Sequence, residues 1–313
     1  MHLPYLLATA LLAAAPGSCA PTHDCGCKTP LVRKECFFSL RNVHKAGFTG
    51  NIYAGAKSRY DDFQVSHIVN TDFIHYVGFF QAGAQPYWDW TLDSNSVQDF
   101  ESSPIFDAKT GFGGNGVFID ISSWTNVTRV VSGRSGGGCV TDGPFAKGEF
   151  EVNAGPDNST AYKPRCLARD ISAKYGISKL NQTVVDWTLE AKDFFEFDQR
   201  VQGGGHLAIG GSLGEMGDMY SSPGDPIFWL HHTNVDRLWD KWQRLDWPAR
   251  KSDISGPDTQ YAYPYNFFGD KEYKNITLAY VMDFGNLLPD RRYITVEEAM
   301  DTQAERLCYT YDS

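Results

Sequence analysis

Residues 222–239, SPGDPIFWLHHTNVDRLW, constrain the fold and the chemistry of this chain more than any other segment. Asp225 can cap the exposed N–H groups at a helix start, and Pro226 suits the first helical position, where no N–H is needed. The predicted helix carries two adjacent histidines, His231 and His232, among apolar and aromatic residues. Successive helical residues point about 100° apart, so these two imidazoles are not expected to serve one centre equally.

A carboxylate follows this histidine pair at the spacing of one helical turn. Asp236 lies four residues after His232 and therefore on the same face of the helix. A carboxylate in that position suits the surroundings of a metal site, where it orients an imidazole ring. The alternative is an ordinary buried histidine pair with polar partners.

The composition favours a soluble, exported protein. The 313 residues carry a net charge of −10, with an isoelectric point of about 5.2 and no basic patch, which argues against nucleic-acid binding. Residues 1–20 begin with an apolar run to Ala15 and end in the small residues Ser18, Cys19 and Ala20. This pattern predicts a secretory signal peptide that is too short for a membrane anchor, and hence a secreted chain without a membrane-spanning segment.

Cysteines and glycosylation sequons support secretion. The cysteines beyond the predicted signal peptide allow three disulfides in fifteen connectivities, all of which the sequence leaves open. A zinc site is the alternative for these cysteines, but no paired CxxC motif supports it. The cysteines are Cys25, Cys27, Cys36, Cys139, Cys166 and Cys308. The sequon asparagines are Asn126, Asn158, Asn181 and Asn275.

The rest of the chain reads as one domain over residues 21–313, without an internal repeat or a linker. Residues 60–80 show apolar side chains at helical spacing, residues 168–200 are helical in part, and a further helix is predicted over residues 225–245. Residues 91–165 are rich in Gly, Ser and Asn with interleaved aromatics and cysteines, which predicts long ordered loops.

Histidines occur in two groups. His67 and His75 lie eight residues apart on the first predicted helix, slightly over two turns, and therefore on broadly the same side. His206 follows a glycine run and precedes the pair His231 and His232. Imidazole is a ligand for copper, zinc, iron and nickel, and two histidine groups on separate helices suit a dinuclear site in a helical core. Half-buried surface histidines are the alternative for the first group.

Several motifs carry a resemblance to a known family. Residues 225–239, DPIFWLHHTNVDRLW, resemble the second copper-binding signature of the tyrosinase family, which includes tyrosinases, catechol oxidases and molluscan hemocyanins. The closing YTY of residues 309–311 resembles the motif that ends the family's catalytic domain, and the resemblance covers nearly all of residues 25–313. Four further segments are similar to the short, secreted fungal branch of the family: KSRYDDF at 57–63, PYWDW at 86–90, GGNG at 113–116 and GGGCVTDGPF at 136–145.

The resemblance implies both a fold and an activity. The fold it implies is mainly α, a four-helix core with long ordered loops and few short strands. The family holds two copper ions, each bound by three histidines, and uses O₂ to hydroxylate phenols or to oxidise catechols to ortho-quinones. The expected partners are therefore a small phenolic substrate and O₂, while the oligomeric state stays open.

The resemblance also assigns individual histidines. His67 and His75 match the first two ligands of the first copper. His206 and His232 match the second and third ligands of the second copper. His231 is the neighbour that the family pattern does not use as a ligand.

Two residues near these histidines match family positions as well. Phe228 matches an aromatic residue near the substrate entrance, and Asp236 matches a carboxylate beside the ligands. Phe73 stands two residues before His75, where some relatives have a cysteine, so their thioether link is not expected. The resemblance does not choose between monophenolase and diphenolase activity.

Two of the expected ligands are missing. The third ligand of the first copper should follow His75 by nine residues, where this chain has Ala84. The first ligand of the second copper should precede His206 by four residues, where it has Gln202, and a neutral glutamine is a poor copper ligand. We therefore predict an incomplete first-copper region around residues 36–85, with one core helix deleted and copper occupancy reduced.

The missing ligands leave a second function open. The alternative to an oxidase, impaired or not, is a non-catalytic secreted glycoprotein that keeps the tyrosinase-like fold. A splice variant or an imperfect gene model would explain the deletions. Within the enzyme hypothesis, His23 and His44 are alternative ligands from the N-terminal region.

Overall fold

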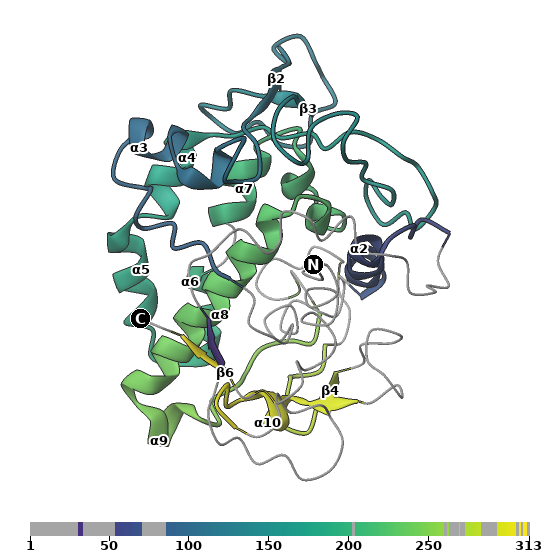
Figure 1. The fold of residues 1–313 in the computed structure, drawn as a ribbon. Helices are drawn as coiled ribbons and strands as arrows, with labels where there is room; N and C mark the ends of the chain where they lie inside the picture. Colours follow the sequence, from purple (N-terminus) through teal and green to yellow (C-terminus); the bar gives the residue numbers. More distant parts are fainter. Residues whose placement is uncertain are drawn as a thin grey trace, which may run out of the picture.

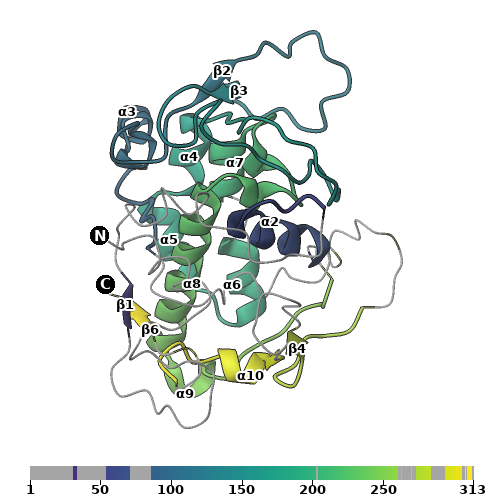
Figure 2. The ribbon, with the colours of Figure 1, turned by 45° about the vertical axis from the view of Figure 1, so that its right-hand side comes forward.

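Helix α8, Ile227–Leu245, is the longest helix among the described residues and runs lengthwise through the middle of the molecule (Figures 1 and 2). Its side chains are buried along most of its length, as expected for a helix that is surrounded by others. Phe63 of helix α2 (Arg59–Asn70) packs against Trp229, with ring centres 5.8 Å apart. Phe197 of helix α6 (Phe194–Val201) packs against Trp242, with ring centres 5.2 Å apart. The helix predicted from the histidine-bearing stretch is therefore the centre of the core.

The computed structural model describes residues 31–33, 54–70, 86–201, 204–259, 262, 269, 273–282, 293–304, 307 and 309–311. The helices in this part of the chain are α2 Arg59–Asn70, α3 Val97–Glu101, α4 Ala173–Lys179, α5 Gln182–Leu189, α6 Phe194–Val201, α7 Gly204–Gly210, α8 Ile227–Leu245, α9 Trp247–Arg250 and α10 Val296–Ala299. Short 3₁₀ turns are η3 Pro104–Phe106, η4 Glu215–Gly217 and η5 Ser222–Gly224.

The predicted start of α8 is confirmed. The Asp225 carboxylate accepts a hydrogen bond from the Ile227 N–H at 3.0 Å, and Pro226 already has helical dihedral angles. The same carboxylate receives two hydrogen bonds, of 2.8 and 2.9 Å, from the guanidinium of Arg169, and both side chains are fully buried. Arg169 also donates to the carbonyl oxygens of Gly113 and Gly114. Through Arg169, the glycine-rich loop of residues 113–116 is thus linked to the beginning of the central helix.

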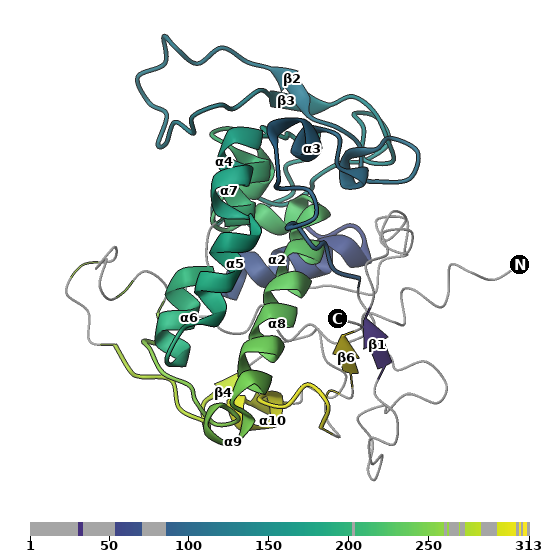
Figure 3. The same ribbon diagram turned by 90° about the vertical axis from the view of Figure 1, so that its left-hand side faces the viewer.

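Strands are few and short. They form three two-stranded sheets: β1 Leu31–Arg33 beside β6 Tyr309–Tyr311 in parallel, β2 Gly116–Phe118 with β3 Gly137–Val140 antiparallel, and β4 Val281–Met282 with β5 Ile294–Thr295 antiparallel. Figure 3 shows β1 and β6 side by side next to α8, so segments from the two ends of the chain meet there. The prediction of a mainly α fold with few short strands is confirmed.

Residues 91–165 are loops with only short elements between them, as predicted. Their conformation is fixed partly by a disulfide between Cys139 and Cys166, whose Cα atoms are 5.5 Å apart, and by a bridge pairing Val152 with Arg165. Of the disulfides left open by the sequence, this is the one within the described residues. The other cysteines of the predicted framework, Cys25, Cys27, Cys36 and Cys308, lie outside them.

The first predicted helix is described in part. Helix α2 covers Arg59–Asn70, which includes His67, whereas residues 71–85 lie outside the described residues. His75, Ala84 and the proposed deletion point lie outside the described residues, as does Gln202. Among the residues that the structure describes, no helix is long and apolar enough to cross a membrane.

Candidate metal centre

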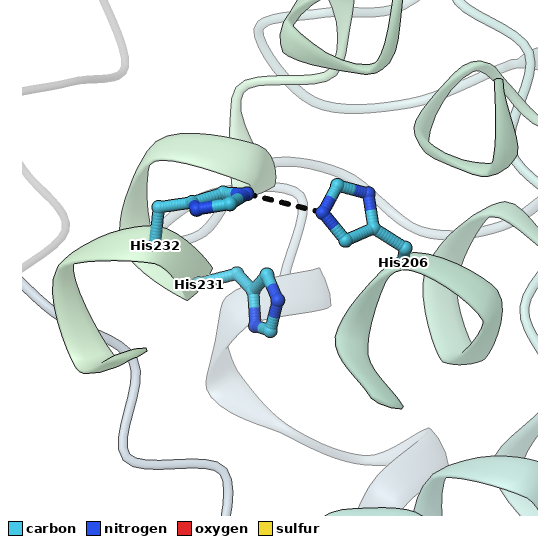
Figure 4. A group of neighbouring side chains, drawn as sticks. All are labelled: His206, His231 and His232. Atoms are coloured by element: carbon cyan, nitrogen blue, oxygen red, sulfur yellow. Dashed lines mark hydrogen bonds between the residues drawn. The ribbon is translucent and has the colours of Figure 1, made fainter. Parts of the chain in front are cut away.

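Three histidines from two helices gather at the start of α8. His206 comes from α7, and His231 and His232 come from α8 (Figure 4). One ring nitrogen from each lies within 4.8 Å of the others. The structure thus brings the late histidines together in one cluster, as a metal site requires.

The closest pair in the cluster is His206 with His232, whose Nε2 atoms are 3.0 Å apart. His206 Nδ1 lies 3.0 Å from the carbonyl oxygen of Met216. Because a carbonyl can only accept, Nδ1 carries the proton, and in a neutral ring the lone pair is then on Nε2. Burial lowers the pKa of His206, which favours that neutral ring at pH 7.

This pair fits a metal ion. Imidazole nitrogens bind zinc-like first-row ions at about 2.0–2.1 Å, and a 3.0 Å separation between two nitrogens corresponds to roughly a right angle at such an ion. A metal-bound histidine also usually donates its other N–H to a carbonyl or carboxylate, which fixes the ring. The bond from His206 Nδ1 to Met216 is a contact of this kind.

His231 lies deeper than its two neighbours and is 2% exposed. Its ring packs against Trp90, with ring centres 4.9 Å apart, and burial lowers its pKa well below the ordinary value. Its Nδ1 faces Gly205, where an added Cβ would approach within 2.3 Å. Among the described residues, nothing forms a hydrogen bond with this buried nitrogen.

His67 reaches the same region from α2. Its Nδ1 lies 2.8 Å from the carbonyl oxygen of Tyr220, so it has the same proton arrangement as His206, with the lone pair on Nε2 when neutral. Its ring contacts Phe228, with ring centres 5.2 Å apart. Phe228 also contacts His206 at 5.6 Å and His232 at 4.1 Å. Phe228 therefore contacts His67 as well as two of the late histidines.

Two further site residues of the sequence analysis have well-defined surroundings. Phe228 is 2% exposed, so it lies buried among imidazoles. The Asp236 carboxylate accepts hydrogen bonds from the hydroxyls of Tyr309, at 2.7 Å, and Tyr311. These bonds join Asp236 to strand β6, and its predicted role beside a histidine ligand stays a prediction.

The residues that frame the cluster carry little signal in the sequence. Trp90 stands in an aromatic motif, and the carbonyls of Met216 and Tyr220 carry no side-chain signal. The PYWDW motif of residues 86–90 was the available clue. Its Trp88 N–H donates to the Leu230 carbonyl at 3.2 Å, which ties the motif to α8 beside the histidine pair.

Known proteins resemble this chain over most of its length. A family model for the common central domain of tyrosinase matches residues 75–245, more than half of the chain. A tyrosinase-like protein of Diaporthe leptostromiformis is 31% identical over 340 aligned residues, covering 91% of this chain and 81% of the relative. Tyrosinase P of Aspergillus terreus is 33% identical over 305 residues, covering 82% of this chain and 81% of the relative.

An oxidase and a solved structure extend the likeness to the whole chain and to the fold. The N-acetyl-6-hydroxytryptophan oxidase of Emericella nidulans is 29% identical and is matched from end to end in both chains. A variant of the polyphenol oxidase from Thermothelomyces thermophila superposes with a TM-score of 0.71 at 27% identity, covering 91% of this chain and 89% of that chain. These findings confirm the resemblance seen in the sequence motifs. The chain belongs to the tyrosinase family, which implies a dicopper centre.

Proposed function

We propose that this chain is a secreted copper oxidase that uses O₂ to convert phenols or catechols to ortho-quinones. The observation that carries the proposal is the facing pair of Nε2 atoms of His206 and His232, 3.0 Å apart, in a chain of the tyrosinase family. When bound, copper supplies the reaction with O₂. The protein contributes imidazoles held by backbone carbonyls and, beside them, the aromatic ring of Phe228.

The roles of the remaining residues follow from their surroundings. We assign His206 and His232 to the second copper and His67, with His75, to the first. His67 and His206 each direct Nδ1 to a backbone carbonyl, which leaves Nε2 as the metal-binding atom. Phe228, which contacts rings of both groups, is assigned to the wall of the substrate space.

The test is copper content and oxygen consumption of the purified chain. After reconstitution with Cu(II) we expect bound copper and O₂ uptake with catechol, and His232→Phe should bind less copper and lose O₂ uptake because one of the two facing nitrogens is removed. Trp187→Phe, at a half-exposed position on α5, is the control and should retain both. A folded wild-type chain that binds copper but consumes no O₂ with any phenol or catechol would contradict the proposal.

A non-catalytic glycoprotein of the same fold is the second candidate. Its support is Gln202 at a ligand position, together with the alignment to the Emericella nidulans oxidase, which runs over 386 positions although this chain has 313 residues. This chain thus lacks residues that the relative has. Absence of copper after reconstitution would favour this candidate, and a longer transcript from the same gene would identify the chain as a shortened form.

Secretion is part of the proposal and has its own test. The sequon residues Asn126, Asn158 and Asn275 are exposed, as glycosylation requires. We expect the chain to appear in the medium of a eukaryotic host, to begin near residue 21, and to lose mass after treatment with an N-glycosidase. Retention inside the cell without glycans would contradict this part of the proposal.

A further inference from the structure

We infer that His231 is a copper ligand in this chain and completes a three-imidazole site with His206 and His232. The family pattern leaves this histidine outside the ligand set and uses position 202 instead, where this chain has Gln202. The inference rests on the proposed copper function, and it concerns which nitrogens hold the ion.

The arrangement of the three rings supports a shared ion. The ring centres of His206, His231 and His232 form a nearly equilateral triangle with sides of 5.2, 5.2 and 5.1 Å. Imidazoles at tetrahedral angles on one ion, with the metal–nitrogen distance of about 2.0 Å known for zinc, have ring centres about 5 Å apart. The rings thus already have the spacing of ligands on one ion, and Figure 4 shows them around a common space.

The nitrogens require a smaller adjustment. The Nε2 atoms of His206 and His232 already face each other at 3.0 Å. The three histidine nitrogens of the cluster lie up to 4.8 Å apart, whereas nitrogens on one tetrahedral ion are about 3.3 Å apart. A turn of the His231 ring about its Cβ–Cγ bond changes the direction of its nitrogens while the ring centre moves little. Binding of copper is therefore expected to reorient this ring and leave the helix backbone in place.

The buried nitrogen of His231 gives the second line of support. A buried polar atom without a partner costs about 1–3 kcal/mol, and native structures keep few of them. His231 Nδ1 is such an atom among the described residues, in a side chain that is 2% exposed. A phenylalanine would fill the space against Trp90 without this cost.

The space beside His231 Nδ1 requires a glycine on the neighbouring helix. Helix α7 approaches His231 with Gly205, and any side chain there would begin 2.3 Å from Nδ1. His206 follows Gly205 directly in the sequence, so the close approach of α7 brings the ring of His206 beside that of His231. One glycine thus lets two helices present three imidazoles to the same space.

The experiment counts the nitrogens bound to copper. The full chain with His67→Phe, which removes a ligand of the first site, receives one equivalent of Cu(II) and is studied by pulsed EPR. We expect three coupled imidazoles. Adding His231→Phe should reduce the count to two and weaken Cu(II) binding about tenfold or more. Trp90→Phe is the matched control, because it changes the packing of His231 and removes no nitrogen, so its count should stay at three.

Each other outcome overturns the inference. The inference is overturned if only two imidazoles are counted before His231 is changed. It is also overturned if the count stays the same after His231→Phe, or if the folded chain binds no Cu(II). If His231→Phe does not fold, as judged by circular dichroism, the count in the chain that keeps His231 decides. Catechol oxidation by the wild-type chain is measured separately: activity with only two imidazoles contradicts the inference alone, and three imidazoles without activity contradict the proposed function alone.

Discussion

A Cβ atom at residue 205 would lie 2.3 Å from Nδ1 and 2.5 Å from Cε1 of His231, closer than non-bonded atoms approach. We therefore expect Gly205→Ala to displace that ring or to push α7 away from α8. Overpacking of this kind costs about 1–3 kcal/mol, and copper affinity should fall with it. Urea unfolding and Cu(II) titration measure the two effects. Gly114→Ala is the control, because its Cβ would meet atoms no closer than 3.6 Å, and equal effects in both variants would contradict the expectation.

The buried histidines also predict a pH dependence for the metal-free protein. Burial lowers the pKa values of His206 and His231 below the ordinary value of 6.5. As the pH falls through 6.5, the unfolded chain therefore takes up protons that the folded chain does not, and the folded state loses stability. The free energy of unfolding should be smaller at pH 5.5 than at pH 7.5. His231→Phe should reduce this difference, and a variant with the same pH dependence as the wild type would refute the assignment.

The grouping of His206, His231 and His232 is visible in the sequence, whereas the close approach of their rings is seen only in the structure. The 100° step between neighbouring helical residues fixes the direction of the Cα–Cβ bond, and it predicts that His231 and His232 do not serve one centre equally, which stays a prediction. An imidazole extends well beyond Cβ, however, and the approach of α7 at Gly205 depends on packing that no local pattern encodes. The partners of Asp236 were missed for a similar reason, because Tyr309 lies 73 residues later in the chain.

Helix α8 depends at its first turn on a buried ion pair. The local signal of Asp225 and Pro226 was sufficient to predict where the helix starts, whereas Arg169 lies 56 residues away and could not be paired with Asp225 in advance. Water cannot solvate the guanidinium in place of the carboxylate, because both side chains are fully buried. Position and stability of the histidine-bearing helix are therefore linked to the glycine-rich loop through one arginine.

Removing the carboxylate should destabilise this whole region. Asp225→Ala leaves the Arg169 charge buried and unpaired, which costs about 3–5 kcal/mol, and the cap of α8 is lost as well. The midpoint of chemical unfolding measures the effect. Glu196→Ala removes the partner of Arg200 from a more exposed pair on α6 and serves as the control with a much smaller change. A loss for Asp225→Ala as small as that of the control would show that the buried pair contributes little.

On the scale of the molecule, the two ends of the described chain close over the central helix. Strand β1 pairs with β6, and Tyr309 and Tyr311 of β6 donate to Asp236 of α8. The family resemblance predicted the mainly α architecture and singled out the YTY motif. The contact that this motif makes could not be predicted, since it joins segments that are distant in sequence.

The closing strand yields a prediction for the whole fold. Tyr309→Phe removes a buried hydroxyl that donates to Asp236 and leaves the carboxylate with one fewer donor, which should cost about 1–3 kcal/mol. Because β6 is joined to both β1 and α8, we expect one cooperative transition at lower temperature. Calorimetry tests this, with Tyr162→Phe at a half-exposed position as control. A separate early transition, or no shift relative to the control, would contradict it.

The pairing of β1 with β6 has a consequence for biosynthesis. Strand β6 is synthesised after every other described segment, so Asp236 stays without the two donors Tyr309 and Tyr311 until translation has passed them. Pairings between segments so distant in sequence also form slowly. The nascent chain is thus expected to hold its histidine helix in incomplete surroundings until β6 has been synthesised, and metal loading would follow the pairing of β6 with β1.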